Sequence, residues 1–239
     1  MTQNLDYDIN TSKTLTSSDT DISANWTPTR STIATGSLSS STWTNDKTTP
    51  YSYDPGDVYY YTSGSTSDDT TYSSLSACTS AGHSEGDCAH YHAGNYYNWT
   101  AAVAMNGSSS YTANYNNVNQ SICPAGWRLP VGMTAASTSG DYANLIYSAG
   151  IVSAKSTSTS SQSYATNGFV NIRAEPLWFV RSGYVYSGAL NDAGSYGYYW
   201  SSSVYSSNSA YSLYFGSSRV YPQSRSDRYN GNSVRCVAR

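Results

Sequence analysis

Residues 196–239 read YGYYWSSSVYSSNSAYSLYFGSSRVYPQSRSDRYNGNSVRCVAR, a segment that contains eight tyrosines and twelve serines. These residues lie around three short motifs, Trp200-Ser201-Ser202-Ser203, Phe215-Gly216 and Ser233-Val234-Arg235-Cys236. Tyrosine offers a large amphipathic contact area with only two torsions to restrict, while serine and asparagine add adaptable hydrogen bonds, as in antibody combining sites. This tail is therefore typical of a binding surface on a rigid support.

One segment of the tail predicts its own orientation. In residues 210–215 the two-residue period of a strand places Tyr211, Leu213 and Phe215 on one face and Tyr214 on the other. We expect Leu213 and Phe215 in the core and Tyr214 free to face a ligand.

The length of 239 residues allows one compact domain with an ordered extension. Charged residues make up only 11%, but 25 tyrosines and 6 tryptophans exclude the disordered class. We expect residues 51–239 to form the domain, with its ligand-binding region at about 196–230. Residues 1–50 are expected to form a loop-rich extension anchored by apolar side chains, namely Ile9, Leu15, Ile22, Trp26, Ile33, Leu38 and Trp43.

The remaining sequence predicts short elements. A turn at 54–57 leads into a strand at 58–62, and the polar segment 63–88 is predicted to be loop. Apolar spacing favours helices over 96–105 and 140–149, with Asp141 as the cap of the second. Further strands are expected at 177–181, 197–202, 210–215 and 233–238. These elements together predict an α+β fold.

The four cysteines allow three pairings, and no C-x-x-C spacing indicates zinc. We favour Cys78–Cys88, which closes a short loop, and Cys123–Cys236, which ties the end of the chain to its middle. Disulfides indicate an oxidising location. The polar start at residues 1–4 does not resemble a signal peptide, so we expect either a start after such a signal or another export route, such as a virus particle released by lysis.

Charge is uneven along the chain. Residues 1–195 carry seven basic and fourteen acidic side chains, whereas the tail carries five arginines against Asp227. Nucleic-acid binding would require clustered cations, but these arginines are dispersed and the overall net charge is −3. We expect no nucleic-acid partner, and we expect some of the five to be buried support residues: Arg219, Arg225, Arg228, Arg235 and Arg239.

Four stretches occur in order along the chain: GNYYNWTAA at 94–102, CPAGWRLP at 123–130, GYYWSSS at 197–203 and GNSVRCV at 231–237. As a set they resemble the C-type-lectin-like fold of the formylglycine-generating-enzyme type. That version of the fold is found in bacterial paralogous surface domains and in variable proteins of diversity-generating retroelements. The resemblance spans about residues 50–239. It implies a small antiparallel sheet with two helices and long ordered loops, which displays a ligand face near the C-terminal end.

In those retroelement proteins, residues near the C-terminus vary because a template is copied with errors at adenines. The resemblance implies that variable positions of the tail contact the ligand; the candidates are Tyr196, Tyr198, Tyr205, Ser207, Asn208, Tyr211, Tyr214, Ser217, Ser218, Tyr221, Gln223, Ser224, Ser226 and Asp227. Gln223 does not fit, because changing the adenines of an AAC codon never encodes glutamine. The implied partner is a protein or cell-surface molecule.

Catalytic and metal chemistry are poorly represented. The chain has no Gly-x-Ser-x-Gly, phosphate loop or His-Glu-x-x-His, and its tail lacks the cysteine pair of a formylglycine-generating enzyme. Glu175-Pro176-Leu177 and the segment 43–46 do not match the calcium motifs of C-type lectins. His90 and His92, near His83, have a spacing compatible with a metal, but one pair is a weak signal. We predict no metal, cofactor or catalytic activity.

Two alternatives stay open. A structural cation at Asp54, Asp57, Asp68 or Asp69 is possible, although solvated turn carboxylates are the simpler interpretation. The chain is also compatible with a non-variable structural or adhesive domain of a cell-surface lipoprotein. In either case we expect an extracellular protein, on a cell surface or virion, and we favour a monomer. No apolar run is long enough for a membrane span.

Overall fold

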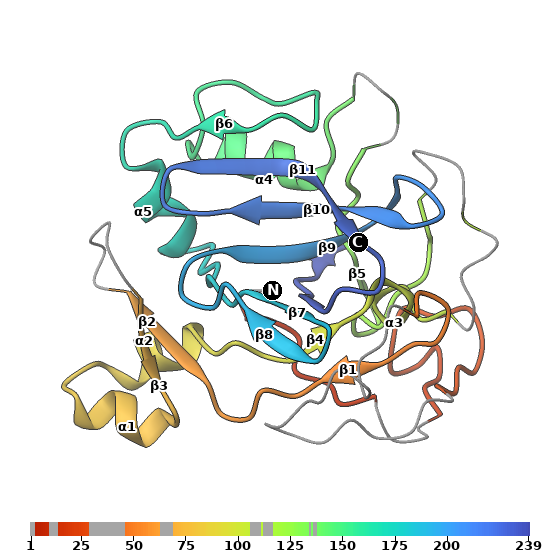
Figure 1. Cartoon of the computed structure of the whole chain (residues 1–239), viewed down its shortest axis with the longest axis horizontal. Helices are drawn as coiled ribbons and strands as arrows, with labels where there is room; N and C mark the ends of the chain where they lie inside the picture. Colours follow the sequence, from red (N-terminus) through yellow and green to blue (C-terminus); the bar gives the residue numbers. More distant parts are fainter. Residues whose placement is uncertain are drawn as a thin grey trace.

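The computed structural model describes residues 3–9, 14–28, 46–62, 69–105, 111, 117–133, 135 and 138–239 (Figure 1). Three of the expected anchors, Ile33, Leu38 and Trp43, lie outside these residues. The described helices are α1 (Leu75–Ser80), α2 (Glu85–His90), α3 (Trp99–Ala102), α4 (Asp141–Ser148) and α5 (Gly168–Arg173). The strands are β1 (Ser52–Tyr53), β2 (Tyr59–Thr62), β3 (Asp69–Tyr72), β4 (Tyr96–Tyr97), β5 (Trp127–Arg128), β6 (Gln162–Ser163), β7 (Tyr184–Tyr186), β8 (Ala189–Asn191), β9 (Gly197–Val204), β10 (Ser209–Phe215), β11 (Arg219–Asp227), β12 (Asn232–Ser233) and β13 (Val237–Ala238).

The main sheet has the strand order β1-β4-β12-β9-β10-β11-β6. Its long strands β9, β10 and β11 are antiparallel neighbours, whereas the short β12 runs parallel to β9 and antiparallel to β4. Three two-stranded sheets, β13-β5, β2-β3 and β7-β8, complete the described strands. The architecture is therefore mixed α+β, as the sequence predicts, although the main sheet has seven strands and one parallel pair where small antiparallel sheets were expected.

The four sequence stretches at 94–102, 123–130, 197–203 and 231–237 meet in space, and we call them the motif frame. Strands β4, β12 and β9, which come from three of the stretches, are neighbours in the main sheet, and β13 pairs with β5 of the fourth. Two tryptophans connect the frame: Trp99 Nε1 donates to the carbonyl of Ser201, and Trp200 Nε1 donates to that of Tyr97. Both indole rings are fully buried, so their N–H groups need these partners.

Both expected disulfides are present. Cys78–Cys88 joins α1 to α2, and Cys123–Cys236 joins the stretch before β5 to the stretch before β13. The second bridge closes a separation of 113 residues, so it restricts the unfolded chain far more than the first, whose separation is 10.

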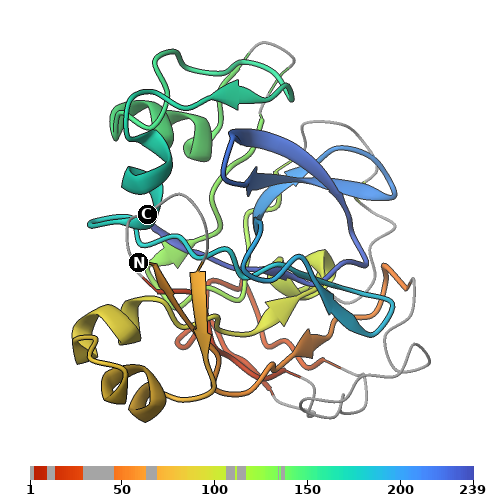
Figure 2. The same cartoon turned by 60° about the vertical axis from the view of Figure 1, so that its left-hand side comes forward.

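The two faces of β9 and β10 have different surroundings. Tyr199, Leu213 and Phe215 project from one face and pack in a cluster with side chains of α4 and α5, which lie on one side of the strands in Figure 2. Trp200 belongs to a second cluster, on the other side of β9. Leu213 and Phe215 are thus core residues, as the strand period predicts.

The N-terminal segment contributes to the second cluster. Ile9, Leu15, Ile22 and Trp26 are buried together with Trp99 of the motif frame. Backbone bonds add to this packing, because Leu5 N–H donates to the Val234 carbonyl.

Helix α4 lies where the sequence predicts it, but Asp141 is its first residue and not its cap. The cap is Gly140, where a Cβ would stand 1.3 Å from the Gly132 carbonyl oxygen. The Asp141 carboxylate instead accepts from Val131 N–H at 2.7 Å and pairs with Arg128 at 2.5 Å. The helix expected at 96–105 is shorter, because residues 96–97 pair as β4 and only Trp99–Ala102 is helical.

Several expectations were wrong in detail. The strand expected at 233–238 is divided between β12 and β13, and the described residues form five helices where two were expected. Residues 63–88, predicted as loop, contain β3, α1 and α2, whose helices begin at the side-chain caps Ser74 and Ser84. Residues 177–181 form no strand, and helix α5 just before them was not predicted. Strand β11 was also missed, because its largely polar composition hides a strand that is held by pairing with β10.

Candidate functional site

Three tyrosines stand side by side on the face of the sheet opposite α4 and α5. Tyr214 of β10 is the direct cross-strand partner of both Tyr198 on β9 and Tyr221 on β11. Its ring centroid is 4.8 Å from that of Tyr198 and 5.0 Å from that of Tyr221. All three side chains are half-buried, so each still presents part of its ring to solvent.

The row continues at both ends. Tyr196 stacks on Tyr214 with centroids 5.2 Å apart, and Tyr184 of β7 lies 4.7 Å from Tyr198. The Tyr196 ring packs directly over Gly216, and a larger residue would clash there, because a Cβ at position 216 would be 2.5 Å from the ring. We call Tyr184, Tyr198, Tyr214, Tyr196 and Tyr221 the tyrosine row. Because each ring is already held by its neighbours, little side-chain entropy is lost when a ligand binds.

A hollow of about 320 Å³ opens beside this row. It lies between β7, the end of β9 and the end of β11, and it is lined by Tyr184, Tyr198, Tyr205, Ser209, Arg225, Ser226, Asp227 and Asn230. Arg225 donates to the Tyr205 hydroxyl at 2.7 Å, and its guanidinium carbon is 4.6 Å from the centre of that ring. We call this cavity the tail hollow.

Burial and neighbouring carboxylates raise the pKa of two tyrosines near the tail hollow. Burial, followed by the hydrogen bond to Asp227, raises the pKa of Tyr229 to about 12. Burial and then the hydrogen bond to Asp192 also raise the pKa of Tyr198. Both hydroxyls therefore remain protonated donors well above neutral pH.

Most residues predicted to contact a ligand do lie at the surface. The exposed or half-buried members are Tyr196, Tyr198, Tyr205, Ser207, Asn208, Tyr214, Ser217, Ser218, Tyr221, Ser224, Ser226 and Asp227. Ser207 and Asn208 lie before β10, and Ser217 and Ser218 lie after it, so these two pairs flank the row at opposite ends of the strand.

Two predicted contact residues are buried and cannot touch a ligand in this conformation. Gln223 is 0% exposed, accepts from Gly140 N–H at 2.6 Å and donates to the Ser158 carbonyl. Tyr211 is 1% exposed, as the strand period of β10 already suggests, and its ring makes an edge contact with Tyr205. Gln223 is thus a support residue, in agreement with its poor fit to the pattern of codons.

The sequence missed two contributors to this surface. Tyr184 belongs to the β7–β8 hairpin, outside the tail, and the bridges from Gly183 to Gly197 and from Val185 to Gly231 bring it beside β9. Arg225 is in the tail, but nothing in its sequence context separates it from Arg228 and Arg235, which are buried. Because two of the five tail arginines are internal, the positive charge of the tail does not form a continuous basic surface.

The histidines have other partners. His83 stacks on Tyr61, His90 stacks on Trp178, and His92 lies against Tyr59.

The acidic residues considered for a cation also have other partners. Asp69 is bound by Arg173 and Arg181, and Asp54 accepts from Gly56 N–H. Asp68 lies outside the described residues. Within the described part of the chain, no three His, Cys, Asp or Glu side chains gather as metal ligands.

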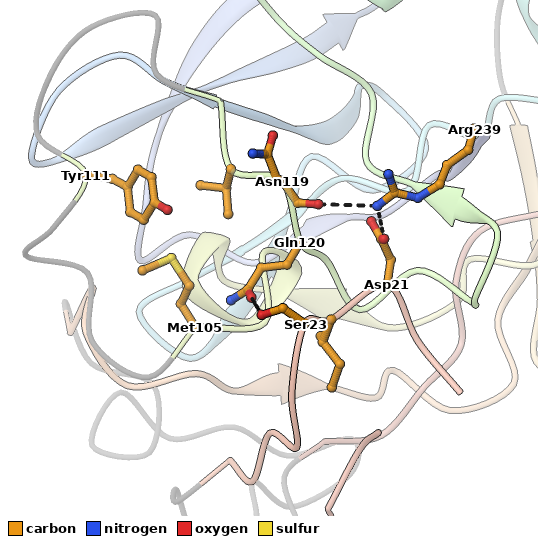
Figure 3. Close-up of a pocket in the computed structure, with 9 residues that line it drawn as sticks. Asp21, Ser23, Met105, Tyr111, Asn119, Gln120 and Arg239 are labelled. Carbon is orange, nitrogen blue, oxygen red and sulfur yellow. Dashed lines mark hydrogen bonds and ion pairs between the residues drawn. The ribbon is translucent and has the colours of Figure 1, made fainter. Parts of the chain in front are cut away.

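A second hollow, of about 350 Å³, lies near the end of the chain (Figure 3). Several of its polar groups bind one another: Arg239 pairs with Asp21, and Ser23 donates to Gln120 at 3.3 Å. It includes no residue of the tyrosine row.

Comparison with known proteins adds no further assignment. No family model matches the chain, and no curated protein or solved structure matches it.

Proposed function

We propose that this chain is a ligand-binding protein with a C-type-lectin-like fold, whose tail surface is diversified by a retroelement to recognise protein or cell-surface targets. The observation that carries the proposal is the tyrosine row, which extends across four strands on the face that α4 and α5 leave uncovered. Its position next to the motif frame matches the ligand face that the sequence resemblance implies.

The architecture supports a separation between support and variable surface. Most of the motif frame is buried and hydrogen-bonded, whereas the tyrosine row, which includes Tyr198 of the frame, and the flanking serines are at the surface. Surface positions of this kind tolerate substitution, because their changes usually alter stability by less than about 0.5 kcal/mol. Binding of this type requires neither a cofactor nor turnover.

The location follows from the same proposal. Two disulfides favour an oxidising compartment, and an external target requires exposure on a cell or a virion. Among the described residues no helix is both long and apolar enough to span a bilayer.

The test is to sequence the genomic neighbourhood of the coding region for residues 196–239. We expect a near-copy of this segment beside a reverse transcriptase gene, with mismatches at adenines and concentrated in codons for surface residues such as Tyr198, Tyr214 and Tyr221. Mismatches should be absent from the codon of the buried Gln223. If no such copy exists, the diversified function is refuted, and a fixed adhesive domain of a surface lipoprotein becomes the better explanation.

A further inference from the structure

The tail hollow has a chemistry of its own within the binding surface. We propose that it takes a basic side chain, lysine or arginine, from a protein partner. This inference rests on the proposed ligand-binding function and adds the class of group that the surface recognises.

The walls of the hollow suit a cation. Tyr184 and Tyr198 line it with aromatic rings, and such rings attract ammonium and guanidinium groups, as the guanidinium of Arg225 over the Tyr205 ring illustrates. The Tyr184 and Tyr198 rings are held at 4.7 Å from each other, so this wall is formed before a ligand arrives. A cavity of about 320 Å³ lies at the lower end of the range for ligand sites and therefore suits a single side chain.

The one carboxylate that lines the hollow is Asp227, and it has no ion-pair partner among the described residues; Asp192 lies outside the lining, next to Tyr198. Asp227 accepts hydrogen bonds from the hydroxyls of Ser209 at 3.2 Å and Tyr229 at 2.8 Å, and Asp192 accepts from the Tyr198 hydroxyl at 2.9 Å. Neither carboxylate forms an ion pair with any described lysine, arginine or histidine. Hydroxyl donors leave the carboxylate charge in place, so a ligand cation can supply the missing partner.

Arg225 also lines the hollow but does not neutralise Asp227. Its guanidinium is held against Tyr205 by the hydrogen bond to the hydroxyl and by its position over the ring. Arg225 lies two residues before Asp227 on β11, so its charge is on the same face of the strand and reduces the affinity for a basic group. An acidic ligand would pair with Arg225, but it would also bring its charge close to Asp227.

The two possibilities predict opposite effects of substitutions. Removing the charge of Asp227 weakens binding of a basic side chain, and removing the charge of Arg225 strengthens it. For an acidic side chain both effects have the reverse sign.

The experiment titrates the full chain with three blocked peptides, acetyl-Gly-Arg-Gly-amide, acetyl-Gly-Gln-Gly-amide and acetyl-Gly-Glu-Gly-amide, and follows backbone amide signals by NMR. We expect the arginine peptide to bind with a Kd on the order of 1 mM, with shifts at residues 184, 198 and 227. Asp227→Asn should weaken this binding about three- to tenfold, and Arg225→Gln should tighten it at least twofold. Asp57→Asn, an exposed carboxylate before β2 that does not line the hollow, is the matched control and should change nothing.

Each other outcome overturns the inference. If the glutamate peptide binds best and Arg225→Gln abolishes its binding, the hollow recognises an anion. If no peptide shifts the signals at 10 times the expected Kd, the hollow is not a side-chain site. Either result leaves the diversified surface to be judged by the gene neighbourhood, so the two proposals fail independently. If Asp227→Asn alters the spectrum throughout the chain, Tyr184→Ser is the replacement variant, with the same expected loss.

Discussion

Replacing Tyr205, Tyr214 and Tyr221 together by serine should leave the fold intact, whereas replacing Tyr199 alone should severely destabilise it. All three surface tyrosines are half-buried; Tyr214 and Tyr221 contact each other and their neighbours in the row, and Tyr205 contacts Tyr211 and Arg225. Each aromatic pair contributes about 0.5–1.5 kcal/mol, and partial exposure reduces this further. We expect the triple variant to lose about 1–3 kcal/mol of unfolding free energy, or about 3–10 °C in Tm.

Tyr199 differs because it is 0% exposed and hydrogen-bonded. Its hydroxyl donates to the Val180 carbonyl at 2.7 Å and accepts from Val180 N–H at 2.9 Å, and its ring meets Phe179 edge to face. Truncating a buried aromatic ring costs about 3–5 kcal/mol. Each backbone group left unpaired adds about 1–3 kcal/mol. The single change Tyr199→Ser should therefore lower Tm by more than about 10 °C.

The assay is thermal unfolding of the two variants beside the parent chain and Tyr147→Ser. Tyr147 is 48% exposed and lies on α4, so its loss controls for removing a surface ring. If the triple variant falls as far as Tyr199→Ser, the row is part of the structural support and the binding interpretation of these tyrosines is refuted.

Three further predictions concern the frame and the core. Arg235→Met should lower the unfolding free energy by more than about 3 kcal/mol in denaturant unfolding, because the oxygen acceptors on Asn4, Leu177 and Trp178 lose their donor. The same change at the exposed Arg225 should cost less than about 0.5 kcal/mol. Equal losses would contradict the assigned burial. Replacing Cys123 and Cys236 by serine should cost about 4–5 kcal/mol, as expected for a closed loop of roughly one hundred residues, and an unchanged unfolding midpoint would mean that the bridge does not restrict the unfolded chain. Burial raises the pKa of Tyr60 to about 12 from its usual 10.0. The protonated hydroxyl therefore contributes fully to stability below about pH 10, and this contribution is lost as the pH rises through 12. Unfolding midpoints measured at pH 8, 10 and 11.5 should fall only in the last step, and Tyr60→Phe should reduce that fall.

Local sequence patterns predicted several elements correctly. Helix α4, strands β9 and β10 and both disulfides were found from apolar spacing, strand period and cysteine positions. Boundaries were less accurate, because Asn98 caps α3 while the residues just before it pair with β1 and β12. That pairing depends on partners far away in the chain, which no local window contains.

The candidate site divides in the same way. The sequence located the tyrosine-rich tail, and most of its named positions are at the surface. It marked Gln223 as a misfit to the codon pattern but still placed it among the contact residues, because its burial depends on the backbone of Gly140 and Ser158. It also could not add Tyr184, which reaches the surface through a separate hairpin.

The sequence by itself predicted an aromatic-rich, disulfide-bonded α+β chain with a tail rich in tyrosine and serine beside four short sequence motifs. These properties follow from composition and short periods, which are local. Tertiary structure alone decided which tail residues face outward, because the side of a sheet that is covered depends on where α4, α5 and the N-terminal segment pack. It also decided that Arg225 and Asp227 line one hollow without forming an ion pair, since that geometry arises only when β7, β9 and β11 come together.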